Sequence, residues 1–234
     1  MSLNLRRSLC ALAPIAALVP WAGLAWPLSA LAALSEQDAA SGIRATLEKG
    51  ALAAVELLGV NDGFLGNPKV RIPLPDSLRK VRSAARIFGL DDEFEALEVG
   101  INRAAEAAVP QAKALLVDAA RKVTVRDALD IVRGGDDSVT RYFRGSAGEQ
   151  IGERFLPIVS RSISKLDLAK KYDRLASQAG RLGLVKEDQA SLDRYVTGKA
   201  VDGLFLVIAE KERSLRADPL GSGSAILKKV FGGL

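Results

Sequence analysis

Chemistry in this chain has to use oxygen and nitrogen groups other than imidazole, because the sequence contains no histidine and only one cysteine, Cys10. A serine–histidine–aspartate triad is therefore excluded, and a zinc site is not expected because zinc is usually bound by histidine and cysteine. Oxygen ligands for calcium or magnesium remain. Asn61, Asp62 and Asn67 offer such oxygens within one loop, but Asn-Asp-Gly is first of all a turn signal. We expect no metal and no cofactor.

The densest run of polar groups follows a Gly-Gly break and extends from Asp136 to Arg144. Arg141 and Arg144 are three residues apart, which places them on one face of a helix, where their planar guanidinium groups could clamp an anion. Asp137 and Thr140 belong to the same run. The alternative is that these acids only cap a helix and form internal ion pairs.

A second polar group is predicted where Lys199 and Asp202 enter the most apolar stretch of the sequence. Ionisable side chains in such a place must be paired or must line a cleft. Asn102 and Glu106 share one helix face by their spacing of four residues. All four could line one polar pocket, or they could pair among themselves and with Arg103.

The best candidate for a ligand site combines these groups with the polar loop residues, although no catalytic motif is present. Ser-x-x-Lys occurs at 77–80 and 162–165 but without its companion motifs. The candidate ligand-binding residues are Asn61, Asp62, Asn67, Asn102, Glu106, Asp137, Thr140, Arg141, Arg144, Lys199 and Asp202.

Apolar residues recur at helical spacing along nearly the whole chain, which predicts an all-α bundle of about eight to ten helices without a substantial sheet. Ser35 is expected to cap the first helix and Gly59 to end it. Residues 60–75 contain turn signals and three prolines, and their apolar residues predict a long ordered loop.

Local signals also predict several helix boundaries farther along the chain. Asp91 and Asp92 are expected to cap one helix and Thr124 another. Ser146 begins a capping box with Glu149, which predicts the start of a new helix. The last long helix is expected to have a joint near 197–198.

The first 32 residues have the pattern of an export signal. Arg6 and Arg7 precede a small and apolar run that closes with Ala30-Leu31-Ala32. Cleavage there predicts a periplasmic protein, by the general or the twin-arginine route, with a helical domain at 33–221 and a tail at 222–234. A retained membrane anchor is the alternative, although two prolines interrupt the apolar run.

The charge balance does not favour a nucleic-acid partner. The chain has 33 basic and 28 acidic residues, and removal of the two leader arginines lowers its formal net charge from +5 to +3. These charges are interspersed rather than gathered in a basic block, so nucleic acid is not expected as a partner.

Several motifs together resemble one protein family. In order they are LGVNDGF with IPLP, NRAAEAAVPQA, RYFR, FLPIVS, YVTGKAVDGLF and LKKVFG. They cover residues 34–234 and are similar to the exported bacterial family called domain of unknown function 4197. The resemblance implies an envelope location and a compact helical fold, but no activity. The chain differs in having a Gly-Ser-Gly-Ser hinge at 221–224, where an arginine-threonine stretch is expected.

Three hypotheses for function follow. The first is a non-catalytic periplasmic module that binds a small ligand or an envelope protein. The second is a carboxylate-dependent hydrolase acting on an envelope glycan or a phosphorylated substrate. The third is a peripheral membrane protein that uses an amphipathic tail helix, whose apolar face is Ile226, Leu227, Val230 and Phe231. The same face could instead dock in a groove of the domain.

Overall fold

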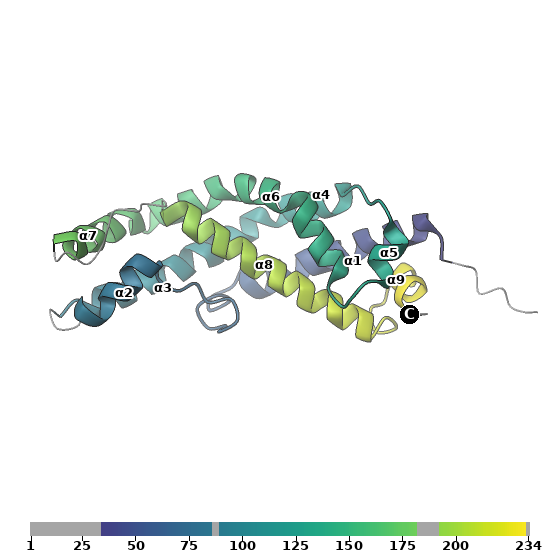
Figure 1. Ribbon diagram of the computed structural model, residues 1–234, viewed down its shortest axis with the longest axis horizontal. Coiled ribbons are helices and arrows are strands. Elements are labelled where there is room, and N and C mark those ends of the chain that lie inside the picture. The colour runs from purple at the N-terminus through teal and green to yellow at the C-terminus, as the bar shows by residue number, and fades with distance from the viewer. Residues whose placement is uncertain (1–33, 86–88, 182–191, 233–234) are drawn as a thin grey trace, which may run out of the picture. The chain divides into compact units, whose positions relative to one another are not determined.

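The computed structural model describes residues 34–85, 89–181 and 192–232 (Figure 1), so the predicted leader lies outside the described residues. Within these ranges the chain forms helices and no strand, which confirms the all-α fold class. The α-helices are α1 (Glu36–Leu58), α2 (Asp76–Ala85), α3 (Asp91–Ala108), α4 (Lys113–Lys122), α5 (Ala128–Arg133), α6 (Ser138–Lys165), α7 (Leu168–Arg181), α8 (Leu192–Ala217) and α9 (Ala225–Phe231), and a 3-10 helix, η2 (Val109–Ala112), precedes α4.

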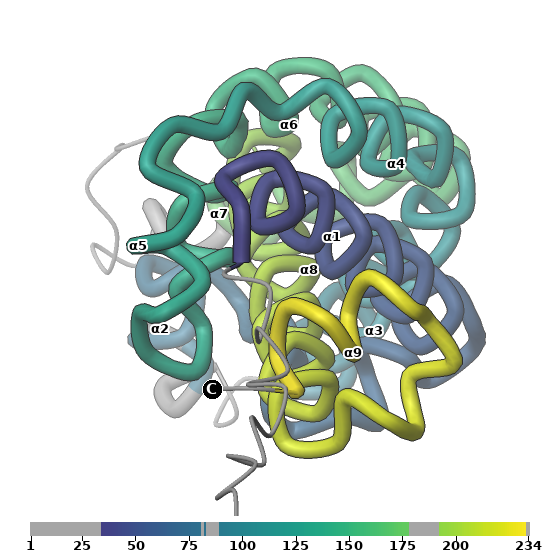
Figure 2. The backbone as a smooth tube through the Cα atoms, turned by 90° about the vertical axis from the view of Figure 1, so that its right-hand side faces the viewer, coloured from purple at the N-terminus to yellow at the C-terminus, as the bar shows by residue number. Residues whose placement is uncertain are grey.

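Helix α1 runs through the middle of the bundle, where it contacts α4, α5, α8 and α9 (Figure 2). Its N-cap is Ser35, whose hydroxyl oxygen accepts a hydrogen bond from the Asp38 backbone N–H, and Gly59 follows its last residue. Both sequence-based boundaries are therefore confirmed. The apolar residues at helical spacing, among them Ile43, Leu47 and Leu58, are fully buried, as expected for an amphipathic helix.

Helices α6 and α8 are longer than their local sequence signals predicted. Helix α6 passes through Ser146 without a break, and the Ser146 hydroxyl donates to the Phe143 carbonyl instead of capping a new helix. Helix α8 likewise continues through 197–198. The two helices pack along each other (Figure 1), and buried side chains such as Phe143 and Phe155 in α6 favour one continuous helix over an exposed capping box.

Two helices have their N-caps at other residues than predicted. The N-cap of α5 is Asp127, in a left-handed conformation, rather than Thr124. The N-cap of α3 is Leu90, and Asp91 and Asp92 form the first helical turn. Acidic side chains are still favourable in that turn because they face the positive end of the helix dipole.

The tail helix α9 packs against α1 and α8. Leu227, Val230 and Phe231 are buried, and Ile226 is half-buried. Most of the predicted membrane-facing surface is therefore covered by the domain itself. Among the described helices, none combines the length and the apolar character that crossing a bilayer would require.

Candidate functional site

The eleven candidate residues fall into two groups in the structure, so they do not share one pocket. The first group closes the 60–75 loop onto α3 and consists of Asn61, Asp62, Asn67, Asn102 and Glu106. The second group lines a hollow beside α8 and consists of Asp137, Thr140, Arg141, Arg144, Lys199 and Asp202.

Asn102 binds the loop backbone from inside the protein. Its side chain is completely buried, its Oδ1 accepts from the Ile72 backbone N–H at 2.8 Å, and its Nδ2 donates to the Ile72 carbonyl at 2.8 Å. The same Nδ2 group also donates to the Glu98 carbonyl at 2.9 Å. These bonds satisfy backbone groups that would otherwise be buried without partners. The amide therefore has a structural role.

Glu106 holds the beginning of the same loop. Its Oε1 accepts from the backbone N–H groups of Phe64 and Leu65, both at 3.0 Å, while its Oε2 accepts from Arg103 at 2.7 Å. Arg103 also donates to Asp62 at 2.8 Å. The pKa of the Arg103 guanidinium is raised, mainly by its hydrogen bond to Glu106 and next by the one to Asp62.

Asn61 and Asn67 complete this loop without facing the hollow. The Asn61 side chain donates to Asp62, and the Asn67 side chain accepts from the Lys69 backbone N–H at 3.1 Å. Asp62 has a positive φ of 65°, a conformation in which Asp and Asn are favoured among residues with side chains. Among the described residues, no three acidic groups come together to hold a metal. The turn interpretation of Asn-Asp-Gly agrees with these contacts.

Two contacts hold this loop against α8, which creates one wall of the hollow. The Tyr195 hydroxyl donates to the Pro73 carbonyl at 2.9 Å, and burial raises the pKa of this phenol. Gly203 permits the close approach, because a Cβ there would lie 2.9 Å from the Phe64 ring. The stretch from Lys69 to Pro73 is thereby fixed opposite α6.

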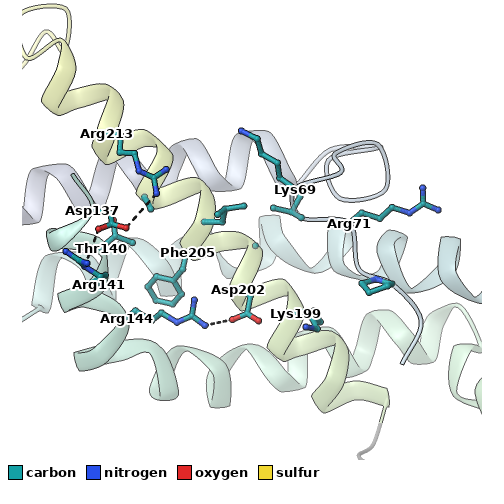
Figure 3. A pocket seen from close by; sticks show the side chains of 15 residues that line it. Lys69, Arg71, Asp137, Thr140, Arg141, Arg144, Lys199, Asp202, Phe205 and Arg213 are labelled. Carbon is teal, nitrogen blue, oxygen red and sulfur yellow. Dashed lines mark hydrogen bonds and ion pairs between the residues drawn. The ribbon is translucent and has the colours of Figure 1, made fainter. Parts of the chain in front are cut away.

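The hollow has a volume of about 470 Å³ (Figure 3), within the usual range of roughly 300–1,000 Å³ for ligand pockets. Its apolar floor is formed by residues of α8 and of the loop, namely Val70, Pro73, Phe205, Leu206 and Ala209. The Phe205 ring packs on Phe143 with centroids 5.6 Å apart, and the Arg144 guanidinium lies 5.5 Å from the Phe205 centroid. A cationic rim thus meets an aromatic floor.

Cationic side chains outnumber acids around the hollow. Of the described residues that line it, six are cationic and two are acidic; the cations are Lys69, Arg71, Arg141, Arg144, Lys199 and Arg213, and the acids are Asp137 and Asp202. Lys69 pairs with Glu210 and Arg71 with Glu98, and neither of these acids lines the hollow.

The two lining acids do not neutralise the remaining four cations. Asp137 is shared by Arg141 at 3.2 Å and by Arg213 at 3.7 Å, while Asp202 pairs with Arg144. Lys199 forms no ion pair within the described part of the chain, and its ammonium lies 6.0 Å from the Tyr195 ring centroid. Positive charge therefore remains in the hollow.

Comparison with known proteins identifies the family. A family model described as protein of unknown function (DUF4197) matches residues 33–232. The chain belongs to this family. No curated protein and no solved structure matches this chain.

Glu212 positions α6 over the hollow, and sequence analysis missed it. Its carboxylate is completely buried and accepts from the backbone N–H groups of Val139 at 3.0 Å and Thr140 at 2.8 Å. It also accepts from the Thr140 hydroxyl at 2.6 Å and from Arg216 Nε at 2.9 Å. These bonds satisfy N–H groups of the first turn of α6, which no intrahelical partner can reach.

The remaining polar partners of this network extend it to neighbouring elements. Arg216 donates to the Val132 carbonyl at 2.7 Å and to the Ser138 hydroxyl at 2.8 Å. Its guanidinium lies 4.7 Å from the Phe231 ring centroid in α9. The only sequence signal for this pair was the spacing of four residues between Glu212 and Arg216, which is common on solvated helix faces as well.

Proposed function

We propose that this protein is a non-catalytic binding module whose ligand is a small anion held between α6, α8 and the Lys69–Pro73 stretch. The observation that carries the proposal is the surplus of cations over acids in a ligand-sized hollow with an apolar floor. Guanidinium groups bind carboxylate or phosphate oxygens through two parallel hydrogen bonds, which gives the hollow a chemical preference for such anions.

The existing ion pairs in the hollow leave room for a ligand. The side chains of Arg144 and Asp202 are 52% and 50% exposed, and that of Arg141 is 67% exposed. Ion pairs this exposed contribute only about 0–1 kcal/mol, so exchange of a protein carboxylate for a ligand anion costs little. Lys199 has no ion pair with any residue that the structure describes, so it has none of these to give up.

The hydrolase alternative is less well supported. A carboxylate acting as a general acid or base should stand alone in the cleft with a perturbed environment. Asp137 and Asp202 are paired with arginines, and Glu106 is bound to backbone N–H groups outside the hollow. The membrane alternative is also less well supported, because Leu227, Val230 and Phe231, which were expected to face the membrane, are buried in the protein.

We further propose that residues 1–32 export the protein to the periplasm and are removed there. The support is the order of Arg6-Arg7, the apolar run and Ala30-Leu31-Ala32. Cell fractionation followed by intact mass measurement tests both parts. A chain that starts near residue 33 in the periplasmic fraction is expected, and a full-length chain in the membrane fraction would contradict cleavage.

Titration calorimetry with ethyl phosphate at low ionic strength tests the binding proposal. We expect saturable binding to one site, and the variant carrying Arg141→Gln and Arg144→Gln should bind about tenfold or more weakly, since each lost charge-assisted hydrogen bond is worth roughly 1.5–3 kcal/mol. Arg121→Gln is the matched control, because Arg121 is an exposed arginine paired with Glu48 away from the hollow. Equal affinity in all three proteins, or no binding, would overturn the proposal.

Native mass spectrometry of the protein purified from its own cells tests the same idea without a chosen probe. A reproducible extra mass that disappears in the Arg141→Gln, Arg144→Gln variant would support the binding module. An extra mass retained by that variant would place the ligand elsewhere and contradict the assignment of this hollow.

A further inference from the structure

A second hollow continues the first along the groove between α6 and α8. Its volume is about 330 Å³, and it shares Arg144, Asp202 and Phe205 with the first hollow. The lining therefore differs between the two hollows: six cations line the first, whereas three of the eight residues that line the second are glycines.

The second hollow is walled largely by backbone and apolar groups. Gly152 of α6 and Gly198 of α8 line it, and a Cβ built on either would meet nothing within 4 Å apart from its own helix backbone and chain neighbours. A Cβ on Gly148 would lie 3.8 Å from the Phe205 ring. These glycines leave open space beside an aromatic face, and the space would take an unbranched apolar group.

The ion pair between Arg144 and Asp202 separates the two hollows. Asp202 lies between Arg144 and Lys199 (Figure 3), and Lys199 precedes it by three residues on the same helix. Side chains at this spacing are neighbours on a helix face. A pairing of Asp202 with Lys199 in place of Arg144 would leave Arg144 for an incoming anion.

We propose that the ligand class of this site is an amphiphile with a single anionic head and an unbranched apolar chain. This inference rests on the proposed function. The head binds Arg141 and Arg144 in the first hollow, and the chain crosses Phe205 into the glycine-walled hollow. Glu149 lines that second hollow, so a second anionic group at the far end of the chain would be repelled.

Affinity as a function of chain length tests the inference. For n-alkyl phosphates from ethyl to octyl, kept below their micelle concentrations, the dissociation constant should fall about two- to fourfold per methylene, the upper factor corresponding to complete burial. Alkane-α,ω-bisphosphates of equal length should gain nothing over ethyl phosphate. An affinity independent of chain length would overturn the inference while leaving the anion site intact.

Leucine substitutions locate the chain. Gly152→Leu and Gly198→Leu place a side chain in the second hollow, and both should fold because a Cβ at either position meets nothing within 4 Å and glycine is unfavourable inside helices. They should remove most of the gain from ethyl to octyl phosphate and leave ethyl phosphate binding unchanged. Gly145→Leu is the control. Gly145 lies in α6 like Gly152, a Cβ there also meets nothing within 4 Å, and Gly145 lines neither hollow.

Three other outcomes would each contradict the inference. If chain-length dependence survives both leucine variants, the chain binds elsewhere and the inference is wrong. If octyl phosphate binds equally well to the Arg141→Gln, Arg144→Gln variant, the signal is detergent adsorption and the inference is also wrong. If ethyl and octyl phosphate both fail to bind, the proposed function and the inference fail together.

Discussion

Replacement of Glu212 by glutamine should destabilise the fold strongly, because this carboxylate holds the first turn of α6 from inside the protein. Its Oε1 accepts from the Val139 backbone N–H and from Arg216 Nε, and its Oε2 accepts from the Thr140 backbone N–H and hydroxyl. Glutamine has the same shape but presents an NH₂ group in place of one oxygen. In either orientation of the amide, at least one N–H donor then faces another donor.

The magnitude follows from burial. A buried N–H without a partner costs about 1–3 kcal/mol. Arg216, whose side chain is only 11% exposed, also loses its charged partner, and breaking a buried ion pair costs about 3–5 kcal/mol. These contributions overlap, so we expect Glu212→Gln to lower the free energy of unfolding by about 3–5 kcal/mol, a large fraction of the roughly 5–15 kcal/mol of a typical domain.

Urea unfolding followed by far-ultraviolet circular dichroism measures this loss. Glu210→Gln is the matched control, because Glu210 lies in the same helix and pairs with Lys69 in an exposed position, so its loss should be below about 1 kcal/mol. Combining Glu212→Gln with Arg216→Gln should cost less than the two single changes added together, since the two residues act as one network. A loss in Glu212→Gln no greater than in Glu210→Gln would refute the reasoning.

Three further predictions concern the loop, the tail and acid. Asn102→Ala should cost about 2–4 kcal/mol in urea unfolding and speed hydrogen exchange at the Ile72 amide, because both backbone groups of that residue lose their partner; slow exchange at Ile72 would contradict this role. Gly42→Ala should cost about 1–3 kcal/mol, because its Cβ would lie 2.6 Å from a methyl group of Val230 in α9, and an unchanged unfolding midpoint would mean that α9 docks differently. The pKa of Asp38 is lowered below its ordinary 3.8, mainly by the hydrogen bond from Lys229 of α9 and next by the one from Ser35. The stability that the charged Asp38 adds to the fold is therefore present above pH 3.8 and is lost as the pH falls through the lowered pKa. The melting temperature should therefore fall on acidification below about pH 4, and it should fall less in an Asp38→Asn variant.

The helical class could be predicted from the sequence because it depends on a repeated local signal. Ile43, Leu47 and Leu58 recur at helical spacing, so they lie on one face of a helix. Packing that face against the rest of the protein removes all three from water, and all three are buried. The 60–75 loop was also predictable, since prolines and turn residues prevent a helix there. Its apolar residues Phe64 and Ile72 are fully buried, as an ordered loop requires.

The candidate site could be predicted only in part. The arginines at 141 and 144 were recognised from their spacing, and Lys199 and Asp202 from their place beside an apolar stretch. Residues from the loop and from the end of α8, such as Lys69, Arg71 and Arg213, were missed because an exposed cation in a polar segment has no distinguishing local pattern. Glu106 and Asn102 were grouped with the site although they bind the loop backbone. The sequence alone does not distinguish a polar residue that satisfies buried backbone groups from one that binds a ligand.

The sequence by itself determined the helical class, the ordered loop and the absence of imidazole chemistry, because residue type, periodicity and turn propensity act over a few neighbouring residues. Only the tertiary structure decided which polar groups became internal partners and which remained in a hollow. Glu212 and Asp202 are both carboxylates in the same helix, yet one is completely buried under the start of α6 and the other is half-exposed beside Arg144. That difference arises from the packing of α6 against α8, which brings together residues 58 to 73 positions apart, a separation over which no local sequence pattern operates.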